Sequence, residues 1–300
     1  MKLAQLRAFV SVAEQGSIGA AARALNFSQP AVTKHIRALE TELGVALIHR
    51  SSRGAELTPL GRSFLSRARS ACQELDRGRE ELAEATKGES GRVVLSASPA
   101  AAAELLPGAL NALRRVNPAV DIRVIEGMPV SSLSRVRDGS LDFALGPKML
   151  EPLTGDLVAT PLYRNKMTIV VRRGHPLAST RSLAALVEYE WMTAGFGRNR
   201  SNVDEMFQGA GLPSPRWVIR CESIPGLIAI VAKSDLIATI PKSILTLGIA
   251  GGLLDTVHIR EQPATSMVCL FVKRESAPTP TAARLIRLIK DEAKRVRSQQ

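Results

Sequence analysis

Apolar side chains recur at helical spacing near the start of the chain. The first apolar stripe begins at Leu3 and ends before Gly16. A second, shorter stripe covers residues 20–25, and Ser17 stands where its hydroxyl can cap that segment. Two short helices separated by a tight turn are therefore expected before residue 26.

A third apolar stripe predicts a helix between Ser28 and Gly44. Ser28 can cap its first turn, and Gly44 ends it. The stripe consists of Val32, Ile36, Leu39 and Leu43. At about 100 degrees per residue, the opposite face is short, polar and basic. It consists of Pro30, Lys34, Arg37 and Thr41, with Gln29 and Thr33 at its flank.

The segment that follows predicts a hairpin and then one long helix. Residues 47–50 and 56–58 flank a turn that contains a glycine, which is typical of a small hairpin or wing. Residues 59–87 have no internal proline, and their apolar positions step by three and four as in a coiled coil. These positions are Leu65, Ala68, Cys72, Leu75, Arg79 and Leu82. The seam favours pairing with a second copy, although Ala68 and Arg79 weaken it, so packing on its own domain stays open.

Beyond residue 91, short runs rich in β-branched residues alternate with amphipathic segments. Strands are predicted at 93–97, 122–125, 143–145, 168–171, 217–219, 236–240 and 268–272. Helices are predicted near 103–116, 132–138, 182–187, 201–210, 224–232 and 280–297. This alternation predicts open, mostly parallel sheets with helices on both faces. Since about 200 residues are generous for one such sheet, two lobes are expected.

Composition limits the class of protein. The chain has 300 residues, of which 45% are apolar and 23% charged, which fits two globular domains and excludes a disordered chain. No apolar run approaches the ~18 residues of a membrane span, and Arg7 and Glu14 interrupt any signal peptide. Cys72, Cys221 and Cys269 lie far apart without a CxxC pair. A cytoplasmic protein without metal or cofactor is expected.

The charge balance favours a polyanionic partner. The formal net charge is +12, from 40 Lys and Arg against 28 Asp and Glu. Residues 1–70 carry ten basic and four acidic side chains, so the excess is densest around the expected polar helix face. Nucleic acid gains affinity for such a surface by releasing counterions. Charge by itself leaves a solvated basic surface equally open.

The motifs of the sequence give little support for an enzymatic function. The four histidines show no HExxH spacing, and there is no GxSxG elbow. Residues 195–200 (GFGRNR) end in arginine where the dinucleotide pattern needs glycine. Glu222 beside Ser223 at a helix start is better explained as a partner of the helix dipole. No catalytic residue is therefore expected.

Residues 3–65 resemble the winged helix-turn-helix of LysR-type transcriptional regulators. The match rests on Ala-Ala-x-x-Leu at 21–25, Ser-Gln-Pro-Ala-Val at 28–32 and Leu-Thr-x-x-Gly at 57–61. Its other members are Ile36, Leu39, Glu40, Leu43, Gly44, Leu47 and Arg50. A looser likeness spans the rest of the chain, because this family joins the module through a long helix to two lobes that resemble periplasmic binding proteins.

The resemblance implies an α+β multidomain architecture. It places a winged helix-turn-helix DNA-binding domain at 1–60, a linker and dimerisation helix at 61–88, and a two-lobed α/β effector-binding domain at 91–300. Lobe I comprises about 91–162 and 267–300, and lobe II comprises about 163–266.

The family's DNA-facing positions lie on or beside the polar face of the third helix, which would enter the major groove. The positions suited to base edges are Gln29, Pro30 and Thr33. Those suited to phosphates are Ser17, Ser28, Lys34, Arg37 and Arg50. Arg53 matches the wing residue that enters or skirts the minor groove. The expected partner is double-stranded DNA that carries an inverted-repeat operator.

A ligand site is expected between the two lobes. Ligands of open α/β sheets bind beyond the carboxyl ends of strands, where loops lead into helix N-termini. Ser98 and Pro99 form such a helix start and Ser223 forms another, which favours a carboxylate or similar anion. The resemblance adds Ala100, Met128, Gly146, Pro147, Thr193 and Phe196. Because Ala100 and Met128 stand near positions where relatives carry hydroxyls, a hydrophobic or aromatic acid is expected.

The expected mechanism and partners follow from this organisation. Effector binding would change lobe closure, and so the orientation of paired DNA-binding domains and the bend in the promoter. The long helix favours a homodimer, the resemblance adds a homotetramer, and RNA polymerase is a further candidate partner. The alternative is a small-molecule sensor that acts through a protein partner instead of DNA, although lysine is depleted at protein interfaces. The identity of the effector, and whether it activates or represses, stay open.

Overall fold

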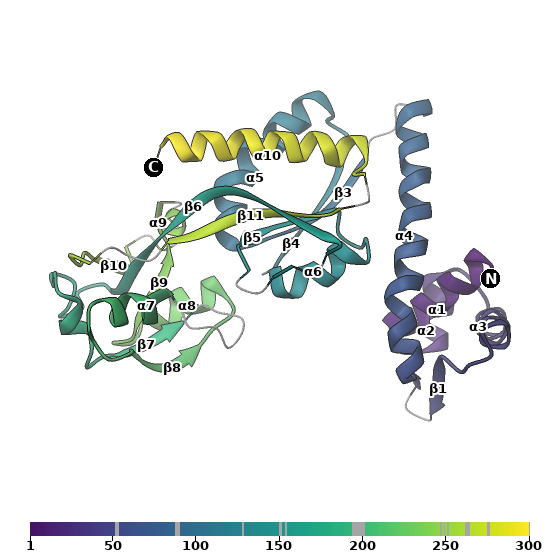
Figure 1. Ribbon diagram of the computed structural model, residues 1–300, viewed down its shortest axis with the longest axis horizontal. Coiled ribbons are helices and arrows are strands. Elements are labelled where there is room, and N and C mark those ends of the chain that lie inside the picture. The colour runs from purple at the N-terminus through teal and green to yellow at the C-terminus, as the bar shows by residue number, and fades with distance from the viewer. Residues whose placement is uncertain are drawn as a thin grey trace.

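The computed structural model divides into a helical N-terminal part and an α/β part, joined at the long helix α4 (Pro59–Lys87) (Figure 1). It describes residues 1–51, 54–87, 91–127, 129–149, 152–153, 155–193, 202–246, 248, 250, 252–261, 265–274 and 277–299.

The N-terminal part is a winged helix-turn-helix. It comprises α1 (Leu3–Gln15), α2 (Ile18–Ala24), α3 (Gln29–Leu43), β1 (Ile48–Ser51) and β2 (Gly54–Leu57). The Ser17 hydroxyl caps α2 by accepting a hydrogen bond from the Ala20 N–H at 3.1 Å. The Ser28 hydroxyl caps α3 by accepting from the Ala31 N–H at 3.3 Å. The predicted helices, hairpin and both caps are confirmed.

An apolar core holds these elements together. Phe9 of α1 and Val32 and Ile36 of α3 are buried in it, and Cys72 joins them from α4. Burial of each such side chain contributes about 2 kcal/mol. Leu43 was expected on the buried stripe but is 38% exposed, because it is the last residue of α3, where the chain turns away from the core.

Contacts at the base of the hairpin explain why several motif residues have the identity they do. Glu40 accepts hydrogen bonds from the N–H groups of Leu47 and Ile48 at 2.8 and 3.1 Å. The Thr58 hydroxyl accepts from the N–H of Gly61 at 2.8 Å. A side chain at Gly61 would collide with the Leu47 carbonyl. The wing is therefore fixed against both α3 and α4.

The α/β part contains the two expected lobes. Lobe I contains β3 (Arg92–Ala97), α5 (Pro99–Val116), β4 (Asp121–Glu126), α6 (Pro129–Arg137), β5 (Phe143–Pro147), β11 (Thr265–Lys273) and α10 (Pro280–Ser298). Lobe II contains the 3₁₀ helix η1 (Leu183–Leu186), β7 (Glu190–Thr193), α7 (Asn202–Gly209), β8 (Arg216–Arg220), α8 (Ile224–Val231), β9 (Ile237–Pro241), α9 (Lys242–Thr246) and β10 (Leu254–Val257). The long strand β6 (Leu157–Arg172) is shared by both.

The strands form one continuous path in the order β4-β3-β5-β11-β6-β9-β7-β8, with β10 also paired to β6. Pairing is parallel at β3/β4, β3/β5, β7/β8 and β7/β9. The expectation of mostly parallel sheets is wrong at the centre, where β6 and β11 pair antiparallel with each other and with their other neighbours. The reason is that β6 leads the chain into lobe II and β11 returns beside it.

Helices cover both faces of the sheet in lobe I, as predicted. Phe143 and Leu145 of β5 point to the core under α5 and α10, whereas Ala144 packs with Val136 of α6 on the other side. Figure 1 shows α10 lying along α5 above this sheet. The strand period of two residues explains the division between the faces.

Some elements went unforeseen or differ in extent. Strands β7 and β10 were not predicted, the strand expected at 168–171 is the C-terminal part of β6, and the helix expected at 182–187 is the short 3₁₀ helix η1. The polar run 164–166 interrupts the apolar pattern, so the part of β6 before residue 168 was not predicted. In the part of the chain that the structure describes, no helix has the length and apolar character of a membrane span.

Candidate nucleic-acid interface and ligand cleft

The outward face of α3 is exposed and basic. Gln29, Pro30, Lys34 and Arg37 are exposed, and Thr33 is half-buried. The stripe behind them packs into the core, so the helix has one apolar and one polar side. The arrangement leaves the polar side available for a groove of DNA.

Two serine caps frame this face. Ser28 is exposed and Ser17 is half-buried, and each hydroxyl oxygen accepts a backbone N–H. The O–H of each serine remains able to donate, and helix N-termini favour negative charge. Both sites suit a phosphate oxygen.

The wing lies beside the turn between α1 and α2. The Ala55 N–H donates to the Gly16 carbonyl at 2.9 Å, and Arg50 pairs with Ala55 in the hairpin register. The side chain of Arg50 and the whole of Arg53 lie outside the described residues.

One arginine of α4 connects the DNA-binding part to lobe I. Arg69 donates from Nε to Glu14 of α1 at 3.1 Å and from Nη1 to Asp138, next to α6, at 2.8 Å. Burial lowers the pKa of Arg69, but the hydrogen bonds and charges of Asp138 and Glu14 outweigh burial and raise it. The guanidinium therefore stays charged and holds both carboxylates.

A second arginine extends this contact. Arg77 is buried and donates to the carbonyls of Gly139 and Leu141 at 3.3 and 3.5 Å. It also lies 3.6 Å from the carboxylate of Asp142, which accepts a hydrogen bond from the Val94 N–H at 2.7 Å. Burial raises the pKa of Asp142, against the effect of that hydrogen bond and of Arg77. Helix α4 thus packs against lobe I through charged groups.

A cavity of about 240 Å³ opens between the lobes. Its walls come from the start of α5, the ends of β4 and β5, the middle of β6, the first half of β11, the start of α8 and the end of β9. The lining residues are Ser98, Pro99, Ala100, Glu126, Gly127, Pro147, Asn165, Met167, Glu222, Ile224, Pro241, Ser266 and Val268.

The structure brings together only part of the expected effector site. Ser98, Pro99, Ala100 and Pro147 line the cleft. Gly146 is buried in β5, and Thr193 and Ser223 lie outside the lining, although Glu222 and Ile224 on either side of Ser223 belong to it. Met128 and Phe196 lie outside the described residues.

Several lining residues were missed by the sequence interpretation. Glu126 ends β4, so the rule that ligands bind beyond strand ends could have identified it. Asn165, Met167, Ser266 and Val268 lie within β6 and β11. They face the cleft because these two strands run between the lobes, and no local pattern marks such positions.

The start of α5 presents a donor to the cleft. The Ser98 hydroxyl accepts from the Ala101 N–H at 3.5 Å, and the Ser98 carbonyl accepts from the Ala102 N–H at 2.8 Å. Pro99 has no N–H. Among the residues described, the N–H of Ala100 is therefore the donor that this helix start offers to a ligand.

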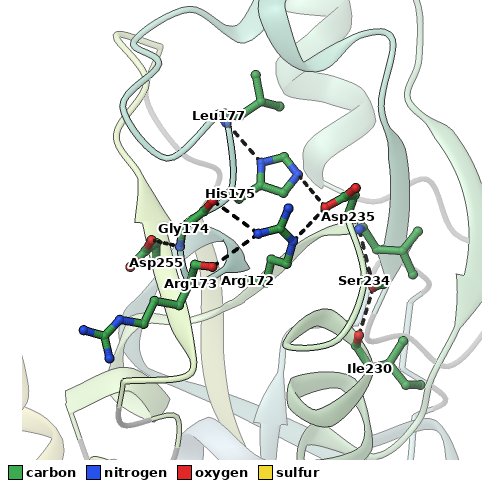
Figure 2. A network of polar contacts seen from close by, with 10 residues as sticks. Arg172, Arg173, Gly174, His175, Leu177, Ile230, Ser234, Asp235 and Asp255 are labelled. Carbon is green, nitrogen blue, oxygen red and sulfur yellow. Dashed lines mark hydrogen bonds and ion pairs between the residues drawn. The ribbon is translucent and has the colours of Figure 1, made fainter.

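Another polar network lies in lobe II (Figure 2). Arg172 donates to Asp235 at 2.7 Å, and the buried His175 accepts from the Leu177 N–H through Nδ1 at 3.1 Å. Burial lowers the pKa of His175, although the charge of Asp235 opposes this. The network anchors the end of β6. Within the described ranges, no cluster of three or more His, Cys, Asp or Glu side chains could hold a metal ion.

Comparison with known proteins gives the same organisation. Residues 3–62 match the family model for the bacterial regulatory helix-turn-helix protein of the lysR family, and residues 86–294 match the LysR substrate binding domain. The regulator GbpR of Azospirillum brasilense is 32% identical over 252 residues, which cover 81% of this chain and 72% of that protein. The regulator PcaQ of Agrobacterium fabrum is 28% identical over 298 residues, which cover 98% and 95%.

Solved structures share the fold along the whole chain. CbnR, a LysR family transcriptional regulator, superposes with a TM-score of 0.74 at 22% identity, covering 98% of this chain and 99% of that one. CbnR complexed with its target DNA gives 0.73 at 23% identity, covering 97% and 100%. Because the substrate-binding model alone matches more than half of the residues, this chain belongs to the LysR-type transcriptional regulators, a non-enzymatic family of DNA-binding proteins with an effector-binding domain.

Proposed function

We propose that this regulator binds an inverted-repeat operator through α3 and responds to a small effector that binds between its lobes. The observation that carries the proposal is the exposed basic face of α3, backed by the buried residues Val32, Ile36 and Leu39 and framed by two serine caps. A protein partner in place of DNA is disfavoured, because the helix-turn-helix family binds DNA.

The side chains divide into two roles at the operator. Base edges in the major groove are read by Gln29, Pro30 and Thr33. Phosphates are contacted by Ser17, Ser28, Lys34, Arg37 and Arg50. Arg53 reaches the minor groove from the wing. The exposure of Lys34 and Arg37 and the serine caps support this division.

The effector is a small anionic compound, such as a hydrophobic or aromatic acid, whose carboxylate lies at the start of α5. The free N–H of Ala100 and the positive end of the helix support this position. The proposed site comprises Ser98, Pro99, Ala100 and Pro147, which line the cleft, together with Gly146, Thr193 and Ser223, which lie outside its lining, and Met128 and Phe196, which lie outside the described residues.

Effector binding changes the closure of the lobes, and so the orientation of paired DNA-binding domains and the bend of the bound DNA. Arg69 supports such a route, since it holds Glu14 of the DNA-binding part and Asp138 of lobe I at once. The domains would divide at 1–60, 61–88 and 91–300, with the lobes meeting where β6 passes from β11 to β9.

A homodimer forms through the second half of α4, and two dimers assemble into a tetramer that contacts RNA polymerase. Ala68 and Cys72 of the seam pack into their own domain, whereas Leu75 and Leu82 are 53% and 67% exposed. Two such leucines are available to a second copy of α4.

A gel-shift titration with the DNA upstream of the chain's own gene tests the DNA-binding assignment. The full chain should shift this fragment at far lower concentration than a scrambled fragment of equal length. The double variant Gln29→Ala/Thr33→Ala should lose most of this preference, and Thr41→Ala, also exposed on α3, should keep it. Equal affinity of the unaltered chain for both fragments would refute sequence-specific binding.

A further inference from the structure

The walls of the ligand cleft carry hydrogen-bond acceptors that a ligand carboxylate bound at the start of α5 would not contact. Glu126 ends β4 in lobe I and Glu222 precedes α8 in lobe II, so each lobe contributes a glutamate to the lining. Asn165 contributes an amide from β6, the strand that both lobes share. An anion by itself would be repelled by the two carboxylates.

Within the described residues, the side-chain oxygen of Asn165 lacks a hydrogen-bond donor, and a ligand could supply one. Asn165 is only 4% exposed, and its Nδ2 donates to the sulfur of Met167 at 3.6 Å. Its Oδ1 is buried and has no hydrogen-bond partner in the described part of the chain. An unpaired buried carbonyl oxygen is costly. A ligand that donates a hydrogen bond at this point would remove that cost.

Positive charge is scarce on the same walls. Among the described residues that line the cleft, none is a lysine or arginine. Lys148 follows the lining residue Pro147 but lies outside the lining, and its charge opposes the rise in the pKa of the Cys269 thiol that burial causes. Cys269 packs on the face of β11 opposite Val268, which lines the cleft. The walls described therefore present net negative charge to a ligand.

We propose that the effector carries a protonated primary amine, and that an amino acid with an apolar side chain represents its class. This inference rests on the proposed effector role of the cleft. An ammonium has three donors, which match the carboxylates of Glu126 and Glu222 and the Oδ1 of Asn165. The ligand's carboxylate lies at the start of α5, and its side chain packs against apolar lining residues. These are Pro99, Met167, Ile224, Pro241 and Val268.

Matched pairs of ligands that differ only in the amine test this class. Titration calorimetry on the full chain would compare phenylalanine with 3-phenylpropionate and leucine with 4-methylpentanoate. In at least one pair, the amino acid should bind at least about tenfold more tightly than the deaminated acid. Equal or tighter binding of the deaminated members, or no binding of either amino acid, would overturn the proposal.

Isosteric variants locate the amine subsite. Glu126→Gln/Glu222→Gln should remove most of the preference for the amine and leave the affinity for the deaminated acid unchanged or higher. Asn165→Leu should weaken the amino member selectively. Glu188→Gln, an exposed carboxylate outside the lining, is the matched control and should change neither affinity. A preference that survives the double variant would overturn the assignment of these groups.

The same titrations separate this inference from the proposed function. If the deaminated acids bind the cleft at least as tightly as the amino acids and alter the footprint on DNA, the effector role stands and the amine proposal fails. If amino acids bind with the expected preference but leave the footprint unchanged, the amine subsite stands and the regulatory role fails.

Discussion

Lys34 and Arg37 lie one turn apart on the exposed face of α3, and their surroundings differ from those of Arg69 and Arg77 in α4. Arg69 and Arg77 are held by carboxylates, whereas Lys34 and Arg37 face solvent. A cation that faces solvent keeps its donors available for phosphate. Exposure, as well as residue identity, therefore decides which cations are available to phosphate.

The Arg37→Ala variant should weaken operator binding and lower its salt dependence. Each phosphate contact contributes about 0.9 to the slope of log affinity against log salt concentration, so the slope should fall by about one contact. Fluorescence anisotropy at several salt concentrations measures it. Arg181→Ala, an exposed arginine in lobe II, is the control. An unchanged slope would remove Arg37 from the phosphate contacts.

His175 should make the stability of the protein depend on pH below neutrality. Burial lowers its pKa in the folded state below the ordinary value of 6.5, so the folded state favours the neutral ring. Stability is then present above pH 6.5 and is lost as the pH falls, because the unfolded state takes up the proton first.

Thermal denaturation between pH 7.5 and pH 5 tests this effect. In His175→Asn the amide oxygen replaces Nδ1 as the acceptor for the Leu177 N–H. The variant should be less stable at pH 7.5 but lose fewer degrees of Tm on acidification than the unaltered chain. Parallel pH profiles for the two proteins would contradict a role for His175.

At the scale of elements, helix α4 has two different halves. Its first half completes the core of the DNA-binding part through Ala68 and Cys72. Its second half leaves Leu75 and Leu82 exposed. The regular spacing of the seam was visible in the sequence, but α1 occupies only its N-terminal half. Packing on its own domain is observed for the first half of the helix, and self-pairing of the second half stays a prediction.

Leu75→Glu/Leu82→Glu should disrupt the proposed homodimer and lower the mass of the assembly. Each leucine buried at a paired seam contributes about 2 kcal/mol, and two glutamates would add like charges across it. Sedimentation analysis gives the mass of the assembly. Leu60→Glu, 55% exposed at the start of α4 and outside the seam, should leave the dimer intact. An unaltered mass in the double variant would place the interface elsewhere.

At the scale of the whole molecule, the lobes, α4 and the DNA-binding part form one connected body. Strand β6 joins the lobes, and Arg69 and Arg77 join α4 to lobe I. A change of lobe closure can therefore reach α3 through packed and hydrogen-bonded groups. Such coupling needs two arrangements that the effector binds unequally.

A saturating effector should change the length of the DNase footprint and the bend angle of the operator. Asp138→Ala removes the link from Arg69 to lobe I and should reduce that response while effector affinity stays within about twofold, since Asp138 lies outside the cleft. Glu188→Ala is the control. A footprint and bend that the effector leaves unaltered would contradict the proposed mechanism.

The sequence by itself determined the elements whose signals are local. The period of the apolar stripe, the serine caps and the closing glycine define α3 within residues 28–44, and the same kind of signal defines α4 from Pro59 to Lys87. Helix periodicity and capping depend on neighbours within one or two turns, so no tertiary information is needed. The polar face of α3 was fixed in the same way.

Only the tertiary structure decided what the cleft contains and where strands run antiparallel. Asn165 on β6 and Glu126 on β4 meet Glu222 of lobe II across a large separation in sequence. Their meeting depends on β6 and β11 crossing between the lobes, which is a property of strand pairing and not of local pattern. The exposure of Leu43 and Leu75 was likewise set by where neighbouring elements end, because burial is a relation between elements.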